Sequence, residues 1–137
     1  MTPVLVDSNV LLDVLIGDTR WAAWSRAVLQ EAGDSSILVI NPLIYAEISV
    51  DFDSIDDLDD AIPPENVRRE PLPFAAAFLA GKAFQAYRRR GGVRRSPLPD
   101  FYIGAHAAVC GYQLLTRDAA RYRTYFPTVQ LIAPRAQ

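Results

Sequence analysis

Short apolar runs alternate along this chain with longer segments that have the periodicity of α-helices. The run ILVI at residues 37–40 is β-branched and uninterrupted, which is typical of a parallel strand covered on both faces. The other predicted strands are residues 4–6, residues 112–116 and residues 129–134. Strands that alternate with helices form parallel sheets, so we predict an α/β fold with a mainly parallel central sheet flanked by helices.

Several segments between the strands carry clear helix-end signals. Asn41 can cap the free amides of a helix that begins at Pro42, because proline suits the first helical position. Ser54 is placed to open a short acidic helix in which Leu58 and Ile62 turn inward. The remaining predicted helices are residues 10–16, residues 21–32 with Gly33 as the stop, residues 74–90, residues 100–111 and residues 119–125.

The chain has 137 residues, of which 50% are hydrophobic, and this size suits one compact domain over residues 1–137. Its formal net charge of -2 would not attract nucleic acid, so a polyanion would need a local basic patch. Cys110 is the only cysteine, which excludes an internal disulfide and fits a reducing cytoplasm. The N-terminus has no basic stretch and no apolar segment approaches the roughly 20 residues of a membrane span, so we expect a cytoplasmic protein without membrane contact.

An acid lies close to each predicted junction between a strand and a helix. Asp7 ends the first strand, and Glu47 lies in the helix that follows the second. Asp100 opens a helix, and Asp118 follows the strand that contains Leu114. Because the carboxyl ends of parallel strands meet along one edge of a sheet, where binding crevices form, we expect these four carboxylates to converge.

Convergence of carboxylates has an electrostatic cost that something must offset. Two carboxylates about 4 Å apart repel by roughly 4 kcal/mol at an effective dielectric constant near 20. Bound protons would relieve this repulsion, and a divalent cation would relieve it with more charge and a chemical use. Oxygen ligands favour magnesium or manganese, whereas zinc favours histidine or cysteine, for which the chain offers only His106 and Cys110.

Each acid taken alone has a simpler interpretation. Asp100 or Asp118 could merely cap a helix, and Glu47 could be solvated. Asp13, among apolar neighbours on the first helix, is predicted to be an acid on an exposed face. Asp7 is harder to explain as a cap, because no helix amide clearly requires it. The pattern of four acids therefore weighs more than any one of them.

Four segments together resemble a known family. VLVDSNVLLDVL, NPLIYAEIS, LPDFYIGAHA and LLTRDAARYRTYFPTVQLIAP are similar to the successive motifs of PIN-domain proteins, and of VapC toxins from bacterial toxin-antitoxin pairs in particular. The four motifs occur in the right order and cover nearly the whole chain. The resemblance implies a single PIN-like domain.

The resemblance also implies an activity and roles for particular residues. It implies an endoribonuclease that depends on Mg²⁺ or Mn²⁺, hydrolyses RNA phosphodiester bonds and is neutralised by a cognate VapB-like antitoxin. By motif, Asp7 and Asp100 would be the main metal ligands, with Glu47 and Asp118 completing the catalytic acids. Asn9 and Thr116 match positions that support those acids by hydrogen bonding. His106 does not match a catalytic position and is expected to be packed or to face a partner.

Two surface features suggest partners. The arginines that end the helix at residues 74–90 and continue into the following loop are predicted to hold the RNA backbone: Arg88, Arg89, Arg90, Arg94 and Arg95. The helix itself is expected to turn Phe74, Phe78, Leu79, Ala83 and Tyr87 inward. The chain nevertheless has more large aromatic side chains than a small core readily hides, so we expect a homodimer.

Other functions remain open at this point. A catalytically inactive PIN-like module could bind RNA or an antitoxin without cutting. A phosphatase with an aspartyl nucleophile would need a second acid two residues after Asp7, where the chain has Asn9. A receiver domain would need a lysine near the crevice, and Lys82, the only lysine, lies in the helix before the arginine-rich loop.

Overall fold

The chain folds around a five-stranded sheet in which every pair of neighbouring strands is parallel. A computed structural model describes residues 2–95 and 97–135, so the outer ends of the predicted domain range 1–137 lie outside the described residues. The strands lie in the order β3-β2-β1-β4-β5, with β1 at the centre. Their bounds are β1 (Val4–Val6), β2 (Leu38–Ile40), β3 (Val67–Arg69), β4 (Gln113–Leu115) and β5 (Leu131–Ile132). The predicted α/β fold is confirmed.

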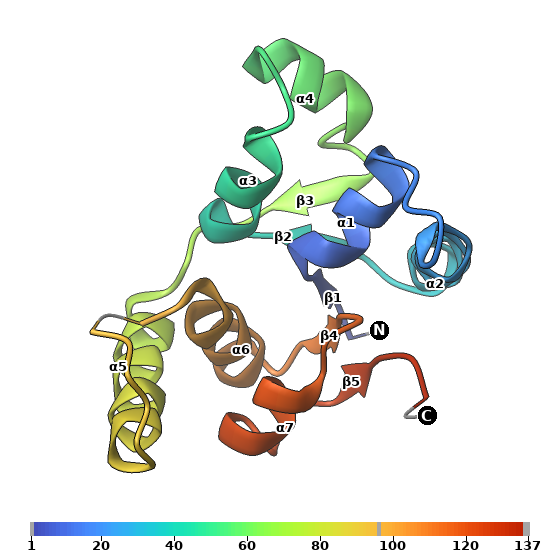
Figure 1. Ribbon diagram of the computed structural model, residues 1–137. Helices are drawn as coiled ribbons and strands as arrows, with labels where there is room; N and C mark the ends of the chain where they lie inside the picture. The colour runs from blue at the N-terminus through green and yellow to red at the C-terminus, as the bar shows by residue number, and fades with distance from the viewer. Residues whose placement is uncertain (1, 96, 136–137) are drawn as a thin grey trace.

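Helices connect the strands and cover the sheet, as Figure 1 shows. They are α1 (Ser8–Leu15), α2 (Ala22–Ser35), α3 (Pro42–Ser49), α4 (Ile55–Ala61), α5 (Phe74–Arg89), α6 (Pro99–Cys110) and α7 (Ala120–Tyr125). Within the described residues, none of these helices has the length and apolarity needed to cross a membrane.

The predicted caps are present. Asn41 accepts a hydrogen bond from the Ile44 amide at 3.0 Å, and Ser54 accepts one from the Asp57 amide at 3.1 Å. These caps form because they depend only on neighbours along the chain. The prediction that Gly33 stops α2 is wrong, because the helix continues to Ser35 and the chain turns extended only at Ser36.

Strand β3, which lies at an edge of the sheet, was not predicted from the sequence. Its residues Val67, Arg68 and Arg69 pair only with β2, so two charged side chains are tolerated there. The guanidinium of Arg69 donates to Asp59 at 2.9 Å and to the Ile62 carbonyl at 2.7 Å. A strand of this composition has no apolar run that would mark it.

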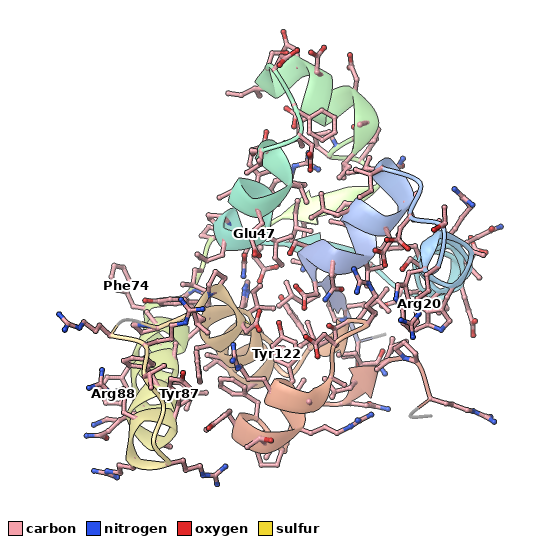
Figure 2. All side chains as sticks on the ribbon, in the orientation of Figure 1. Arg20, Glu47, Phe74, Tyr87, Arg88 and Tyr122 are labelled. Atoms are coloured by element: carbon pink, nitrogen blue, oxygen red, sulfur yellow. The ribbon has the colours of Figure 1, made fainter. Side chains whose placement is uncertain are left out.

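The exposed face of α5 also differs from the prediction. Phe74 is 95% exposed and Phe78 is 69% exposed, whereas Ala76 and Ala80 are fully buried. Figure 2 shows Phe74 projecting from the start of α5. Small alanine side chains let two helix backbones approach closely, so α5 turns its alanine side toward the protein. Tyr87 does turn inward, where its ring lies against Phe101.

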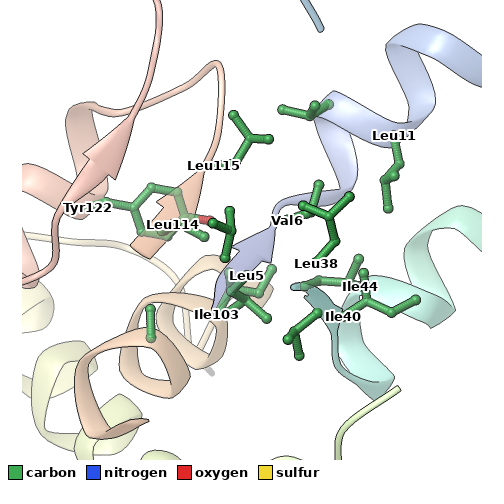
Figure 3. Packing of buried hydrophobic residues seen from close by; sticks show 14 of the residues in the cluster. Leu5, Val6, Leu11, Leu38, Ile40, Ile44, Ile103, Leu114, Leu115 and Tyr122 are labelled. Carbon is green, nitrogen blue, oxygen red and sulfur yellow. The ribbon is translucent and has the colours of Figure 1, made fainter. Parts of the chain in front are cut away.

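The core surrounds β1. Figure 3 shows Leu5 and Val6 between the side chains of β4 and those of β2, and both residues are completely buried. Burial of a side chain of this kind contributes about 1.5–3 kcal/mol to folding. The residue after Val6 is therefore held rigidly at the centre of the sheet's carboxyl edge.

Candidate active site

Asp7 occupies this central position, directly after β1. It is the residue before α1, yet its side chain makes no capping hydrogen bond and is only 4% exposed. Its Oδ2 instead accepts hydrogen bonds from Tyr122 Oη at 2.9 Å, from Thr116 Oγ1 at 2.9 Å and from Asn9 Nδ2 at 3.4 Å. Its Oδ1 has only a long contact with Ser8 Oγ at 3.5 Å. The carboxylate is thus fixed through one oxygen.

Two hydroxyl groups join Asp7 to the neighbouring acids. Ser8 Oγ donates to Glu47 Oε1 at 3.0 Å, beside Asp7. Tyr122 Oη, which donates to Asp7, lies 3.5 Å from Asp100 Oδ1. Figure 2 shows Glu47 of α3 and Tyr122 of α7 on opposite sides of this central region. The structure therefore brings together three of the four predicted acids.

Asp118 lies at the margin of the group. It is exposed on the loop after β4, and its backbone amide donates to Thr116 Oγ1 at 3.1 Å. Burial raises the pKa of Asp100, and the negative charge of Asp118 adds to this. The loop that carries Asp118 is tied to Asp7 through Thr116.

The acid cluster of Asp7, Glu47 and Asp100, with Asp118 at its margin, has little positive charge around it. Burial raises the pKa of Asp7, and the charge of Asp100 adds to this, although hydrogen bonds from Tyr122 and Thr116 oppose it. Burial, followed by the charges of Asp7 and Asp100, also raises the pKa of Glu47. Burial raises the pKa of Asp100 as well, against the opposing effect of Arg121. Within the described chain, the one ion pair to these acids joins Arg121 Nη1 and Asp100 Oδ2 at 3.4 Å.

This set of donors fits a hard divalent cation. Asp7, Glu47 and Asp100 offer carboxylate oxygens only, which magnesium and manganese prefer. A cation would also offset the burial and the neighbouring negative charges that raise the three pKa values. The residues that would hold it are these three acids, with Asp118 at the margin, and their role as ligands stays a prediction.

Three residues of the site were not singled out from the sequence: Ser8, Arg121 and Tyr122. Ser8 stands beside Asp7, but a serine at a helix start is ordinary. Arg121 and Tyr122 lie in a predicted helix whose inward face could not be known. Only the packing of α7 against the sheet edge turns Tyr122, which is 1% exposed, toward Asp7.

Comparison with known proteins identifies the family. The PIN domain family matches residues 4–127. The chain belongs to the PIN domain family. A search of curated proteins gave no match.

Solved structures share this fold. VapBC2 from Rickettsia felis, bound to a DNA fragment from its promoter, has a TM-score of 0.73 at 13% identity, covering 97% of this chain and 99% of that one. DNA-bound VapBC from Salmonella typhimurium has a TM-score of 0.70 at 17% identity, covering 97% and 98%. VapBC-1 from nontypeable Haemophilus influenzae has a TM-score of 0.71 at 16% identity, covering 96% and 97%. At these identities the likeness establishes the fold of the PIN domain.

The prediction that Asp13 is an exposed acid is wrong. It is 1% exposed, and its Oδ2 accepts hydrogen bonds from Arg117 Nε at 2.8 Å and from Ser25 Oγ at 2.8 Å. The guanidinium of Arg117 also lies over the Trp21 ring, 5.7 Å from its centroid. Asp13 is buried because α2 covers this face of α1. The pair joins α1 to the loop that carries Asp118.

A second group of possible ligands lies away from the acids of the PIN domain. Ligand atoms of Glu70, His106 and Cys110 lie within 4.8 Å of one another. His106 is fully buried, which confirms the expectation of a packed histidine. Its Nδ1 lies 3.0 Å from Asn41 Nδ2 and its Nε2 lies 3.2 Å from Glu70 Oε1.

The orientation of Asn41 decides against a metal ion at this second group. Because Asn41 Oδ1 accepts from the Ile44 amide, its NH₂ group must face the His106 ring. Nδ1 therefore accepts, and the ring proton lies on Nε2, which donates to Glu70. A metal ion on Nε2 would move that proton to Nδ1, where it would oppose the NH₂ group. The group instead joins α3, α6 and the end of β3 through hydrogen bonds.

The predicted RNA-binding arginines lie at the end of α5 and in the loop after it, and all are exposed. Arg88 Nη1 donates to the Arg94 carbonyl at 2.7 Å, and Arg90 lies over the Tyr125 ring at 5.3 Å. Figure 2 shows Arg88 and Tyr87 on different sides of α5, with Tyr87 toward Tyr122. No contact with RNA follows from these positions, so their role stays a prediction.

The raised pKa values predict how stability depends on pH. Asp7, Glu47 and Asp100 keep their protons to higher pH in the folded protein than in the unfolded chain. Between about pH 4 and the folded pKa values, the folded state binds more protons, so stability falls as pH rises. In EDTA, we expect a higher melting temperature at about pH 5 than at about pH 7.5.

Excess magnesium at the higher pH should remove most of this difference, because a cation replaces the protons. The lowered pKa values of Asp18 and Glu70 act in the opposite direction, but their stabilisation is lost only as pH falls below about 4.5. A melting temperature in EDTA that rises with pH across this range would contradict the prediction.

Proposed function

We propose that this PIN domain is a divalent-cation-dependent endoribonuclease of the VapC type, which hydrolyses RNA phosphodiester bonds. The observation that carries the proposal is the buried Asp7 carboxylate, which β1 places beside Glu47 and Asp100 and whose hydrogen-bond donors among the described residues are all neutral. A purely structural carboxylate in such a position is normally paired with a cation. The fold likeness to VapBC toxin-antitoxin structures supports the VapC type.

The residues present suit metal-assisted hydrolysis. Bound Mg²⁺ or Mn²⁺ would polarise the phosphodiester and lower the pKa of a bound water. Asp7 is suited to be a fixed metal ligand, because three hydrogen-bond donors restrain its Oδ2. Glu47 is half-buried and hydrogen-bonded to Ser8, and burial raises its pKa, which suits a group that accepts a proton from water.

Cleavage of an end-labelled single-stranded RNA tests the proposed function directly. We expect cleavage with magnesium or manganese and its loss in excess EDTA. Cleavage that survives EDTA would exclude the metal-dependent mechanism. Binding without cleavage under every metal condition would favour the inactive RNA- or antitoxin-binding module.

A VapB-like antitoxin is the proposed protein partner. Several similar folds come from toxin-antitoxin complexes, including one from Klebsiella pneumoniae with a TM-score of 0.61 at 20% identity. We expect the antitoxin to bring an arginine or lysine to the acids, because the cluster contains little positive charge of its own. Co-expression with the product of a small neighbouring gene, followed by purification and a cleavage assay, tests whether such a partner binds and inhibits.

The proposed homodimer would use the exposed aromatic face of α5. Phe74 and Phe78 are 95% and 69% exposed, and large exposed apolar residues side by side on one helix favour association. Phe74→Ser together with Phe78→Ser should shift the molecular mass measured by light scattering from dimer to monomer. Val50→Ser is the control, because Val50 is 84% exposed but lies outside α5. A monomeric wild-type chain at micromolar concentration would contradict the dimer.

The arginines at the end of α5 and in the following loop are proposed to bind the RNA backbone. Their exposure and their position just before Asp100 support this. A protein with a net charge of -2 needs such a local patch to attract a polyanion. Arg94 and Arg95 can be changed without altering α5, because the helix ends at Arg89 and its C-cap is Arg90.

A further inference from the structure

Arg121 lies at the edge of the acid cluster and is not part of the arginine-rich loop. It belongs to α7, directly before Tyr122, and its side chain is 35% exposed. Its Nη1 donates a long hydrogen bond of 3.4 Å to Asp100 Oδ2 in the candidate active site. A guanidinium has five N–H donors, so this single long contact uses little of its capacity.

Two aromatic rings hold the guanidinium in place. Its Cζ lies 5.5 Å from the centroid of Phe101 and 5.9 Å from that of Tyr87. These rings pack against each other with centroids 5.6 Å apart, and Phe101 is completely buried. Cation–π contacts of this kind restrain the guanidinium, and its N–H groups can still donate to another partner. The position of Arg121 therefore does not depend on Asp100 alone.

Arg117 shows what a structural arginine looks like in the same part of the chain. It also lies over an aromatic ring, but its Nε is 2.8 Å from an Asp13 carboxylate that is 2% exposed. Asp100, the partner of Arg121, is 36% exposed. An ion pair between partly exposed groups contributes little to stability, because water screens it. Arg121 can therefore exchange its partner at little cost, whereas Arg117 cannot.

We propose that Arg121 is a phosphate-binding residue of the active site, whose guanidinium binds an RNA phosphodiester beside Asp100. This inference rests on the proposed function. The negative charges of the four acids repel a phosphodiester. Among the described residues, Arg121 is the cationic side chain that forms an ion pair with one of these acids, Asp100. Its planar fork matches two phosphate oxygens, which a lysine ammonium cannot do.

RNA binding measured without cleavage tests this role. Fluorescence anisotropy of a labelled single-stranded RNA is followed in EDTA over a range of salt concentrations, for wild type, Arg121→Gln and Arg121→Lys. Arg123→Gln is the matched control, because Arg123 is exposed on the same helix and the substitution removes the same charge. Arg94→Gln with Arg95→Gln measures the contribution of the loop for comparison.

We expect Arg121→Gln to weaken RNA binding about tenfold and to make the slope of log affinity against log salt shallower by about 0.7, the value for one lost phosphate contact on a single strand. Arg121→Lys should keep the slope and recover part of the affinity, and Arg123→Gln should change neither. In magnesium, Arg121→Gln should raise KM with a much smaller effect on kcat, because the contact exists before and during reaction.

The outcomes separate this inference from the proposed function. If wild type binds and cleaves RNA while Arg121→Gln and Arg123→Gln have the same affinity and salt slope, the role of Arg121 is overturned and the nuclease stands. If wild type neither binds nor cleaves RNA, both fail. If Arg121→Gln is unfolded at the assay temperature, Arg121→Lys provides the test. A slope of log affinity against log salt that is shallower for Arg121→Lys than for wild type then overturns the role.

Discussion

Asp7→Asn is expected to reduce RNA cleavage on the order of 10³-fold or more. The substitution keeps the shape of the side chain and its hydrogen bonds to Thr116 and Tyr122 but removes the charge at the centre of the cluster. Asp100→Asn should have an effect of similar size. Because acids that hold one cation act as a unit, the double variant should be little worse than either single variant.

Thermal melts distinguish loss of function from loss of fold. In EDTA, Asp7→Asn and Asp100→Asn should leave the melting temperature unchanged or raise it, since each removes one member of a repelling group. Asp60→Asn is the control, because Asp60 is exposed on α4, and it should cut as well as wild type. Full activity of Asp7→Asn, or effects of the two substitutions that multiply, would contradict a single metal-dependent unit.

Arg117→Met is expected to lower stability by about 3 kcal/mol, because it leaves the buried Asp13 carboxylate without its ion-pair partner. For a domain of this size the melting temperature should fall by about 10 °C. Denaturant unfolding in EDTA measures the free energy without interference from cation binding. This should be the largest stability effect of any arginine substitution in the loop and helix after β4.

A double-mutant cycle identifies the cause. Asp13→Asn combined with Arg117→Met should recover much of the lost stability, because no unpaired charge is then buried. Arg123→Met is the control, since Arg123 is exposed on α7. If the losses of unfolding free energy in the two single variants simply add in the double variant, the two residues are not coupled. The effect of Arg117→Met then comes from lost packing against Trp21.

Features that depend on neighbours along the chain were predictable. The apolar run Val4–Val6 followed at once by Asp7 indicated a buried strand with an acid at its exit. Asn41 and Ser54 cap their helices with amides three residues away, as expected from local hydrogen bonding. The convergence of Asp7 and Glu47 was also predictable, because the carboxyl ends of parallel strands share an edge. Asp100 opens α6, which follows α5 rather than a strand, so its place beside them depends on how α6 packs.

Features that depend on which surfaces meet were not predictable. Helix α5 has both an alanine side and a phenylalanine side, and only contact with α6 decides that Phe74 is exposed. Asp13 is buried because α2 covers it, and Arg117 can pair with it only because parallel pairing places the exit of β4 beside β1. Strand β3 exists because β2 offers it an edge.

The same distinction applies to the candidate site. The sequence by itself determined that Asp7 and Asp118 lie at strand exits, because an acid just after an apolar run is a local pattern. The tertiary structure alone decided that Tyr122 donates to Asp7 and that Arg121 lies over the Phe101 ring beside Asp100. Residues so far apart in the chain meet only through the angle at which α7 packs on the sheet edge, and that angle follows from long-range packing that no local pattern encodes.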